Sequence, residues 1–507
     1  MKRSSLLFFF ATLLGVACAP AVFAQRPNKP SPAAQTAAAH HRNPIVQTCF
    51  TTDPAPLNVG DSILYVFTGH DEDGADFFWM QEWRVYCTRD MVNWQDLGSP
   101  LALESFTWAD DRAWAAQVIE RNGKFYWYIC AHSTIRGGMA IGVAVADRPE
   151  GPYRDALGHP LFDNGSWDNI DPTVWIDRET GQAWLAWGNP RISMVQLEDD
   201  MIHIRGEVQS IDMTEEGFGS PVMNQREQGK QYRDSYVEGP WLMQKPITTD
   251  TSKKKSSGKK KKGNKNDANT YYLLYAAGGV PEHLSYSSAP SPLGPWHYEG
   301  EIMPLGGTDS FTNHCGYVPF RGHDYFFYHT GHLPGGGGFG RSVAVEEFSF
   351  TPDGRFPTIL PTREGVQPIA TFNPYRRVEA ETMAYSYGLH TDQFSSSAAA
   401  PLSVYVSDIH NGDWLRLDNV DFGTSAAKKL SVHAASALRG GTIELRTDSL
   451  QGPVLATITI NGTGGWEQWQ TFTAPVSPVN GIHDLYFCFR GRKGPKLFNL
   501  DWWRLEK

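Results

Sequence analysis

Residues 122–132, with the sequence NGKFYWYICAH, combine an Asn-Gly turn with a short run of aromatic and aliphatic side chains. A turn followed by such a run is typical of a strand in an antiparallel sheet. The pattern recurs four more times before about residue 350. The other copies are DSILYVFTGHD from Asp61, GQAWLAWGN from Gly181, NTYYLLYAAGG from Asn269 and GHDYFFYHTGH from Gly322. This part of the chain therefore consists of five similar strand-rich units.

Each unit continues with a further strand and more turn residues, and helical periodicity is almost absent. Repeated strand-rich units of similar size indicate the blades of a propeller. The sequence therefore predicts an all-β protein whose residues 43–370 form a five-bladed β-propeller. The innermost strand of each blade lines the central channel, so residues at the same point of each inner strand meet at one mouth.

A short motif precedes the central strand of each unit. The five motifs are Asp53-Pro54, Trp114-Ala115, Asp171-Pro172, Glu238-Gly239-Pro240 and His314-Cys315-Gly316. A single Asp-Pro is more often a turn or a capping aspartate, but repetition in the same context favours a shared site. Two working carboxyl groups and a third that tunes them suit hydrolysis of a glycosidic bond. We therefore expect Asp53, Asp171 and Glu238 to converge as catalytic residues.

A connector containing Pro and Thr around residues 361–374 separates the propeller from a second domain, residues 375–507. Alternating strands in this domain follow one another at roughly ten-residue spacing. They include VYVSDIHNGDWLRLDNVDFG, GGTIELRTDSLQGP and GIHDLYFCFRG. This pattern predicts a β-sandwich of the jelly-roll type.

The N-terminus resembles a targeting segment. Residues 1–24 contain two basic residues, an apolar stretch and a small-residue cleavage site, as a secretory signal peptide does. Residues 25–42 are rich in Pro, Ala and Gln and predict a disordered spacer. Cys18 leaves open a lipoprotein, so we expect a secreted, periplasmic or lipid-anchored protein. No later segment is apolar enough to be a transmembrane segment.

Composition excludes some functions and favours others. The net charge is −10 although eight lysines lie between Lys253 and Lys265, so the body is acidic and unsuited to nucleic acid. The lysine run reads as a solvated loop insertion, with contact to acidic polysaccharide as the alternative. The cysteines beyond the signal are odd in number and scattered, which argues against a disulfide framework. Aromatic residues make up 13%, enough for both a core and sugar-stacking surfaces.

These motifs resemble two known families. Residues from about 43 to 370 resemble glycoside hydrolase family 43, five-bladed propeller enzymes that act on arabinose- and xylose-containing polysaccharides. Residues from about 375 to 507 resemble carbohydrate-binding module family 6. The second resemblance is carried by EAE, GDW, VDFG, IELRTDS, GGWEQW, HDLY and FNLDWW, which occur in the family's order.

The first resemblance assigns roles. It implies that Asp53 is the general base, that Glu238 is the general acid, and that Asp171 raises the pKa of that acid and orients it. It also implies that His314 lies in the channel, where calcium is often bound, and that Arg341 contacts substrate. Gln117 departs from the family pattern, which leaves substrate contacts on that side open. His70, Asp71 and Asp73 read as rim or substrate-contact residues.

The second resemblance concerns the C-terminal module. It implies that Glu379, Glu381 and Asp501 hold a structural calcium ion through oxygen ligands. Tyr405 and Trp466, or Trp469 in place of Trp466, would offer aromatic faces to sugar, and Asn499 would bind sugar hydroxyl groups.

Together these observations predict a secreted, inverting α-L-arabinofuranosidase that releases arabinose from arabinoxylan or arabinan. The alternatives are a β-xylosidase acting on xylan oligosaccharides and a non-catalytic polysaccharide-binding protein. We expect a monomer that needs no cofactor for its chemistry. Because every candidate catalytic residue precedes Thr371, we also expect the two domains to work independently.

Overall fold

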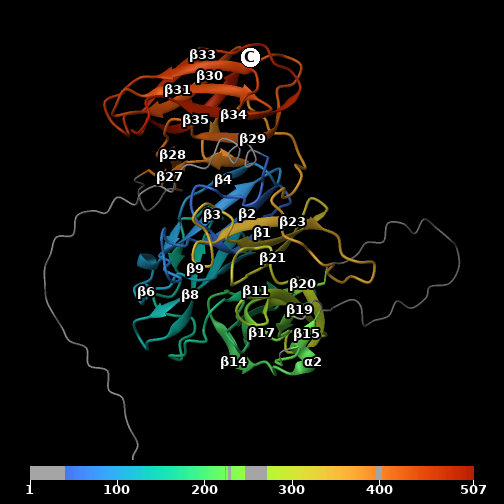
Figure 1. The fold of residues 1–507 in the computed structure, drawn as a ribbon. Coiled ribbons are helices and arrows are strands. Elements are labelled where there is room, and N and C mark those ends of the chain that lie inside the picture. Colours follow the sequence, from blue (N-terminus) through green and yellow to red (C-terminus); the bar gives the residue numbers. More distant parts are fainter. Residues whose placement is uncertain (1–39, 223, 227–229, 246–270, 395–401) are drawn as a thin grey trace, which may run out of the picture.

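The computed structural model describes residues 40–222, 224–226, 230–245, 271–394 and 402–507. The predicted signal peptide and most of the spacer, and the lysine run, lie outside these residues. The described chain is almost entirely β-structure, arranged as a propeller with a sandwich stacked on one side of it (Figure 1). The prediction of an all-β protein with these two architectures is confirmed.

Five sheets form the blades of the propeller, and neighbouring strands within each blade are antiparallel. The fifth blade has three strands in the described part of the chain. The innermost strands are β1 (Thr52–Val59), β7 (Gln117–Arg121), β11 (Thr173–Ile176), β17 (Tyr236–Gln244) and β21 (Gly316–Phe320). Each begins within or close to one of the five motifs.

The remaining propeller strands follow outward in chain order. The second strands are β2 (Ile63–Gly69), β8 (Lys124–Ser133), β12 (Ala183–Trp187), β18 (Tyr271–Ala277) and β22 (His323–Thr330). The third strands are β3 (Glu82–Thr88), β9 (Met139–Ala146), β13 (Ser193–Leu197), β19 (His283–Ala289) and β23 (Ser342–Phe348). The outer strands are β4 (Trp94–Asp96), β10 (Arg154–Asp155), β14 (Ile204–Ser210) and β20 (His297–Met303). Short extra elements are β5 (Leu101–Ala102), β6 (Ala109–Asp111), β15 (Asn224–Arg226), β16 (Lys230–Tyr232), η1 (Leu103–Ser105) and α2 (Glu215–Phe218).

The second strands are the most apolar and are buried on both sides, because each is covered by the neighbouring blades. In β18, all seven residues are buried. Trp83, Trp127 and Tyr328 belong to one apolar cluster that runs between blades. The aromatic richness of the repeated units therefore supplies the packing between blades.

The sandwich has two sheets around a second core. One is built from β24 (Val378–Glu379), β27 (His390–Gln393), β28 (Val404–Ser407), β30 (Lys429–Ala435), β33 (Gln470–Pro475) and β35 (Asn499–Glu506). The other is built from β26 (Tyr385–Tyr387), β29 (Trp414–Asp421), β31 (Gly441–Thr447), β32 (Val454–Ile460) and β34 (Ile482–Arg490).

The two domains share a sheet. Strand β25 (Thr382–Met383) of the second domain pairs with β4, the outer strand of blade 1. Thr382 is opposite Gln95, and Met383 is opposite Trp94. The second domain therefore extends blade 1 by one strand, and Figure 1 shows β27, β28 and β29 lying over β4.

Buried polar contacts reinforce this junction. Asp418 accepts a hydrogen bond from Arg42 Nε at 2.6 Å, and its backbone is paired with the side chain of Asn93. Thr391 Oγ1 donates to Asp96 Oδ2 at 2.7 Å, and Asp96 is itself held by Arg84 at 2.9 Å. Contacts of this kind fix the position of one domain on the other.

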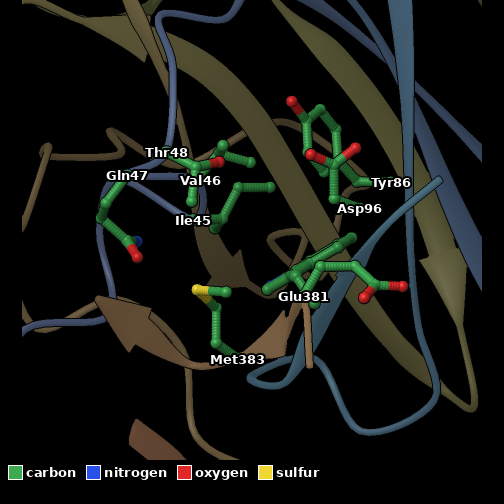
Figure 2. A pocket seen from close by; sticks show the side chains of 9 residues that line it. Ile45, Val46, Gln47, Thr48, Tyr86, Asp96, Glu381 and Met383 are labelled. Atoms are coloured by element: carbon green, nitrogen blue, oxygen red, sulfur yellow. The ribbon is translucent and has the colours of Figure 1, made fainter. Parts of the chain in front are cut away.

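A small pocket lies at the junction (Figure 2). Glu381 and Met383 approach it from the second domain. Ile45, Gln47 and Asp96 approach from the propeller side. None of its lining residues belongs to the channel motifs, and the pocket is part of the interface between the domains.

Candidate active site

Three carboxyl-bearing residues stand at the same end of three inner strands. Asp53 is the second residue of β1, Asp171 lies two residues before β11, and Glu238 lies in β17 between two irregularities of strand register. Asp53 and Asp171 have φ angles of 50° and 58°, in the left-handed region. A residue other than glycine held there costs of order 1–3 kcal/mol and is characteristic of functional sites.

Asp53 lies in a cationic environment. Arg341 Nη1 donates to Asp53 Oδ1 at 3.3 Å, and His329 Nδ1 and His314 Nδ1 lie 3.4 and 3.9 Å from the same oxygen. Thr52 Oγ1 donates to it at 2.9 Å. Burial alone would raise the pKa of Asp53, but Arg341 and the two histidines bring that pKa below its ordinary value. This carboxyl group is therefore ionised over the whole neutral range.

Arg341 is locked in place by Asp71. Its Nε and Nη2 atoms donate to the two oxygens of Asp71 at 2.9 and 2.8 Å, and both side chains are buried. Such a two-point pair fixes the orientation of the guanidinium. The prediction that Asp71 is a rim or substrate-contact residue is therefore wrong, because Asp71 is buried and both oxygens of its carboxylate accept hydrogen bonds from Arg341. Arg341 in turn faces Asp53.

The backbone of Gly239 links Asp171 to Glu238. The Gly239 N–H donates to Asp171 Oδ2 at 3.0 Å, which ties the residue after Glu238 to the Asp171 carboxyl group. Burial and the charge of Glu238 raise the pKa of Asp171, with a further contribution from Asp53. A Cβ atom at position 239 would lie 2.9 Å from His314 Nδ1, and φ there is 61°. Glycine is therefore needed for this close approach.

Glu238 is held by Asn189. The Asn189 amide donates to Glu238 Oε2 at 2.6 Å. Burial raises the pKa of Glu238 most strongly, and the negative charge of Asp53 raises it further, whereas Asn189 and Arg341 oppose the shift. Its net pKa lies above the ordinary value for glutamate. The site thus contains one carboxyl group that is always ionised and another that retains its proton more readily than usual.

His314 borders the same site. Burial lowers its pKa to about 4, and the charges of His329 and Arg341 add to this effect. At neutral pH the imidazole is therefore uncharged, which allows it to exchange hydrogen bonds with a neutral sugar. It lies two residues before β21, where the sequence predicted a channel residue.

Gln117 has a structural role. Its Oε1 accepts a hydrogen bond from the Val174 N–H at 2.9 Å, and its side chain is buried. It thereby joins β7 to β11 just after Asp171. Similarly, Thr173 Oγ1 accepts from the Leu242 N–H and joins β11 to β17. These bonds hold neighbouring inner strands in register around the acids.

An aromatic cluster borders the acids. The Arg341 guanidinium lies over the Phe78 ring at 4.9 Å. Phe78 contacts Trp114, Phe311 and Phe339, with ring centroids 4.9–6.2 Å apart. Phe77 and Trp79 of the same segment are exposed. This set, which we call the aromatic rim, offers apolar faces of the kind that stack on the C–H surfaces of sugars.

In the module, a second aromatic group lies at β28. The rings of Tyr405 and Trp469 are 5.2 Å apart, and Phe394 contacts both. The ammonium group of Lys496 lies over the Trp466 ring, 4.8 Å from its centroid. The structure thus groups Tyr405 with Trp469, the second of the two tryptophans proposed from the sequence. Asn499 donates to the Trp466 carbonyl group at 2.8 Å, so part of its amide positions this loop.

The three candidate calcium ligands lie in two environments. Arg377 binds Glu379 at 2.8 Å and lies 3.6 Å from Asp501. Glu381 instead accepts from Gln95 of the propeller at 3.2 Å, and its buried Oε2 has no hydrogen-bond partner. The donors are hard oxygens of the type that calcium takes, and the orphaned oxygen would gain from a cation. The Arg377 side chain is half exposed, so its ion pair is weak and easily displaced.

A different group of potential ligands lies in blade 4. One atom each of Asp234, His283 and Glu301 falls within 4.8 Å of the others, and two of the residues are buried. The sequence motifs did not indicate this group. It is remote in sequence from Glu379, Glu381 and Asp501, the calcium ligands that the family resemblance implies in the module.

Sequence reasoning missed several residues of the catalytic region, namely Asp71 as a partner of Arg341, together with Asn189, Glu282 and His329. A usable signal was present. In an antiparallel hairpin the end of the second strand lies beside the start of the first, so Thr52 is opposite Gly69, and Glu238 is opposite Ala276. Polar residues just after each second strand therefore belong to the same mouth.

The arrangement as a whole defines a class. An ionised carboxylate and a carboxyl group whose pKa is raised, in one aromatic-lined channel mouth, suit acid–base hydrolysis of a glycoside. The sequence pattern described as "Glycosyl hydrolases family 43" matches residues 41–246, and "Carbohydrate binding module (family 6)" matches residues 379–507. The chain belongs to glycosyl hydrolase family 43 and carries a family 6 module at its C-terminal end.

Several relatives extend this result. An arabinoxylan arabinofuranohydrolase of Paenibacillus polymyxa is 28% identical over 99% of this chain and 80% of its own. A xylosidase/arabinosidase of Bacteroides ovatus is 30% identical over 62% of this chain and 96% of its own. A family 43 arabinoxylan arabinofuranohydrolase from Bacillus subtilis, solved with cellotetraose, has a TM-score of 0.72 and 25% identity, covering 93% of this chain and 99% of that chain. In the part of the chain described, no helix is long and apolar enough to cross a bilayer.

Proposed function

We propose that the protein is a secreted, inverting α-L-arabinofuranosidase that removes arabinose from arabinoxylan. The proposal is supported by the extent of the similarity to relatives. Those named arabinoxylan arabinofuranohydrolase match 92–99% of the chain, including the module. Those named xylosidase/arabinosidase or beta-xylosidase match 61–63% of it. The association of this propeller with this module therefore favours the arabinoxylan activity.

In the proposed reaction, Asp53 accepts a proton from the attacking water, and Glu238 donates its proton to the glycosidic oxygen. The bond between the anomeric carbon and that oxygen breaks as the water oxygen bonds to the anomeric carbon from the opposite face. Arg341 favours the ionised form of Asp53, and burial favours the protonated form of Glu238. Inversion of configuration is what the family resemblance implies.

Product analysis tests the proposal. Purified protein is incubated with wheat arabinoxylan, with linear arabinan, with xylo-oligosaccharides and with the 4-nitrophenyl glycosides of arabinofuranose and xylopyranose. Chromatography should find free arabinose from arabinoxylan and an undegraded xylan backbone. If xylose were released from xylo-oligosaccharides with a higher kcat/KM than arabinose from arabinoxylan, the enzyme would instead be a β-xylosidase.

Replacing Asp171 tests its role beside the acid. Asp171→Asn removes a carboxyl group that, in its ionised form, would raise the pKa of Glu238, so in the proposed role Glu238 should give up its proton at lower pH in the variant. The alkaline limb of the pH–rate profile, which reports the acid's pKa, should move to lower pH, and the rate at neutral pH should fall. Asp200→Asn, at an exposed pair with His203, is the control and should match the wild type. An unmoved limb would remove Asp171 from this role.

Calcium in the module is a further part of the proposal, with Glu379, Glu381 and Asp501 as the residues that would hold it. An ion bound only by the folded state stabilises that state, by about 2.7 kcal/mol at one hundred times its Kd. The melting temperature of the full chain should therefore rise with calcium chloride and fall after chelation. Glu381→Gln should lose this response. An equal response in wild type and variant would place the ion elsewhere, with the position beside His314 as the next candidate.

A further inference from the structure

The turn that follows β12 carries Asn189, whose side chain contacts the proposed general acid. The Asn189 Nδ2–H group donates to Glu238 Oε2 at 2.6 Å. Both residues are partly buried. The bond joins the end of a strand in blade 3 to the first strand of blade 4, and the proposed reaction gives Asn189 no task.

The backbone of this turn is fixed to the segment that leads to Asp171. The Gly188 N–H donates to the Ile170 carbonyl group at 2.8 Å. The Asn189 N–H donates to the Asp168 carbonyl group at 3.3 Å. The turn therefore follows the position of the Asp171 segment.

The same turn is bonded to the segment that carries Glu238. The Tyr236 hydroxyl group, two residues before Glu238, donates to the Gly188 carbonyl group. Glycine is needed at position 188, because φ is 131° and a Cβ atom would lie 2.0 Å from the Arg191 carbonyl oxygen. The amide of the next residue is thus presented to Glu238 from a turn that both acid-bearing segments hold.

The Asn189 contact decides which oxygen of Glu238 can carry the acid's proton. An amide N–H group only donates, so Oε2 is the acceptor and the proton of the neutral carboxyl group lies on Oε1. After that proton leaves, the same N–H group faces a carboxylate, and a hydrogen bond to an ionised acceptor is the stronger one. Burial raises the pKa of Glu238 and the Asn189 bond lowers it, as expected for a donor that favours the ionised form.

We propose that Asn189 is a positioning residue for the general acid: its amide keeps the proton of Glu238 on Oε1 and stabilises the carboxylate that remains after proton transfer. One proton moves, from Oε1 to the glycosidic oxygen, and that oxygen keeps the electron pair of the bond that breaks. The negative charge stays on Glu238. A donor that is in place before the charge develops stabilises the transition state more than the ground state. This inference rests on the proposed role of Glu238.

Two substitutions test this role. Asn189→Ala removes the donor, whereas Asn189→Asp keeps the shape, replaces the donor by an acceptor and adds a negative charge. Asn461→Asp, at an exposed position of the module, is the matched control. Asp53, Asp171 and Arg341 are the same in all variants. The values of kcat and KM are measured across pH on arabinoxylan and on 4-nitrophenyl arabinofuranoside, with melting temperatures to verify folding.

Asn189→Ala should lose roughly ten- to one hundredfold in kcat on arabinoxylan, the range for a hydrogen bond to a charged group, with little change in KM. Its alkaline limb should move to higher pH, because Glu238 loses a bond that favours its ionised form. In Asn189→Asp the limb should move further in the same direction, because the added negative charge also favours the protonated form. The loss of kcat should be smaller on the 4-nitrophenyl glycoside, whose leaving group needs little protonation. Asn461→Asp should match the wild type.

Three results would overturn the inference. A limb that moves to lower pH in Asn189→Ala would show that Asn189 favours the protonated form of Glu238. Equal losses on the two substrates with an unmoved limb would show a structural role only. Wild-type kcat on arabinoxylan in Asn189→Ala would show no role. If Asn189→Ala does not fold, the limb and the two losses of Asn189→Asp, which keeps the shape, decide in the same way.

Failure of the proposed function is seen separately. Glu238→Gln would then keep its activity on the polymer whatever the Asn189 variants do.

Discussion

Glu238→Gln should abolish release of arabinose from arabinoxylan while the protein remains folded. The amide has no proton to give to the glycosidic oxygen, and general acid catalysis contributes roughly 10²- to 10⁴-fold. Asn189 would still be able to bond the amide oxygen at position 238, so the substitution should leave the local geometry intact. The measurement is initial-rate release of arabinose, with circular dichroism as the check on folding.

Activated substrates sharpen this test. An aryl arabinofuranoside with a good leaving group needs little protonation, so Glu238→Gln should retain much more of its rate there than on the polymer. Glu347→Gln, at an exposed pair with His323, should behave as wild type on both. Near-normal activity of Glu238→Gln on arabinoxylan would contradict the assignment of the acid.

Deleting the chain after Thr371 should destabilise the propeller and lower activity even on small soluble glycosides. This reverses the expectation drawn from sequence, which treated the domains as independent. The deletion removes β25 from the sheet of blade 1 and removes the partners of Arg42, Asn93 and Asp96. With about 1 kcal/mol for each of several lost hydrogen bonds, the melting temperature should fall by roughly 10 °C.

A full-length variant separates binding from docking. Trp469→Ala removes one ring of the module's aromatic group and leaves the shared sheet intact. It should bind insoluble arabinoxylan less well but keep the melting temperature and the turnover of 4-nitrophenyl arabinofuranoside. A truncated protein that equals the wild type in both properties would mean that the junction contributes nothing to the propeller.

The positions of the acids could be predicted because the blades repeat. The same motif at the start of successive inner strands identified Asp53, Asp171 and Glu238, and propeller geometry brought them to one mouth. Asn189 and Glu282 were not predicted because each lies in a loop whose sequence does not recur from blade to blade. Pairing within each hairpin would have placed them, since both follow the second strand of a blade whose first strand carries an acid.

The junction between domains could not be predicted from sequence. The EAE motif indicated Glu381 as a metal ligand, and nothing in that motif indicated that one of its carboxyl oxygens also contacts Gln95 of the propeller. Partners such as Arg42 and Asp418 are separated by most of the chain. Charged residues that form such pairs show no periodicity in the sequence, so only the folded structure reveals which of them are partners.

The strand shared by blade 1 and the module also sets how the enzyme explores a polymer. A module on a loose tether samples a wide volume and lets its catalytic partner reach many substituents from one anchor point. Here the shared sheet and the buried hydrogen bonds between the domains hold the module at one position relative to the channel mouth. For a polysaccharide chain held by the module, the enzyme would serve substituents at that offset and would have to release and rebind to reach the others. The junction would then set the distance along the polysaccharide between the site bound by the module and the substituent that is cleaved.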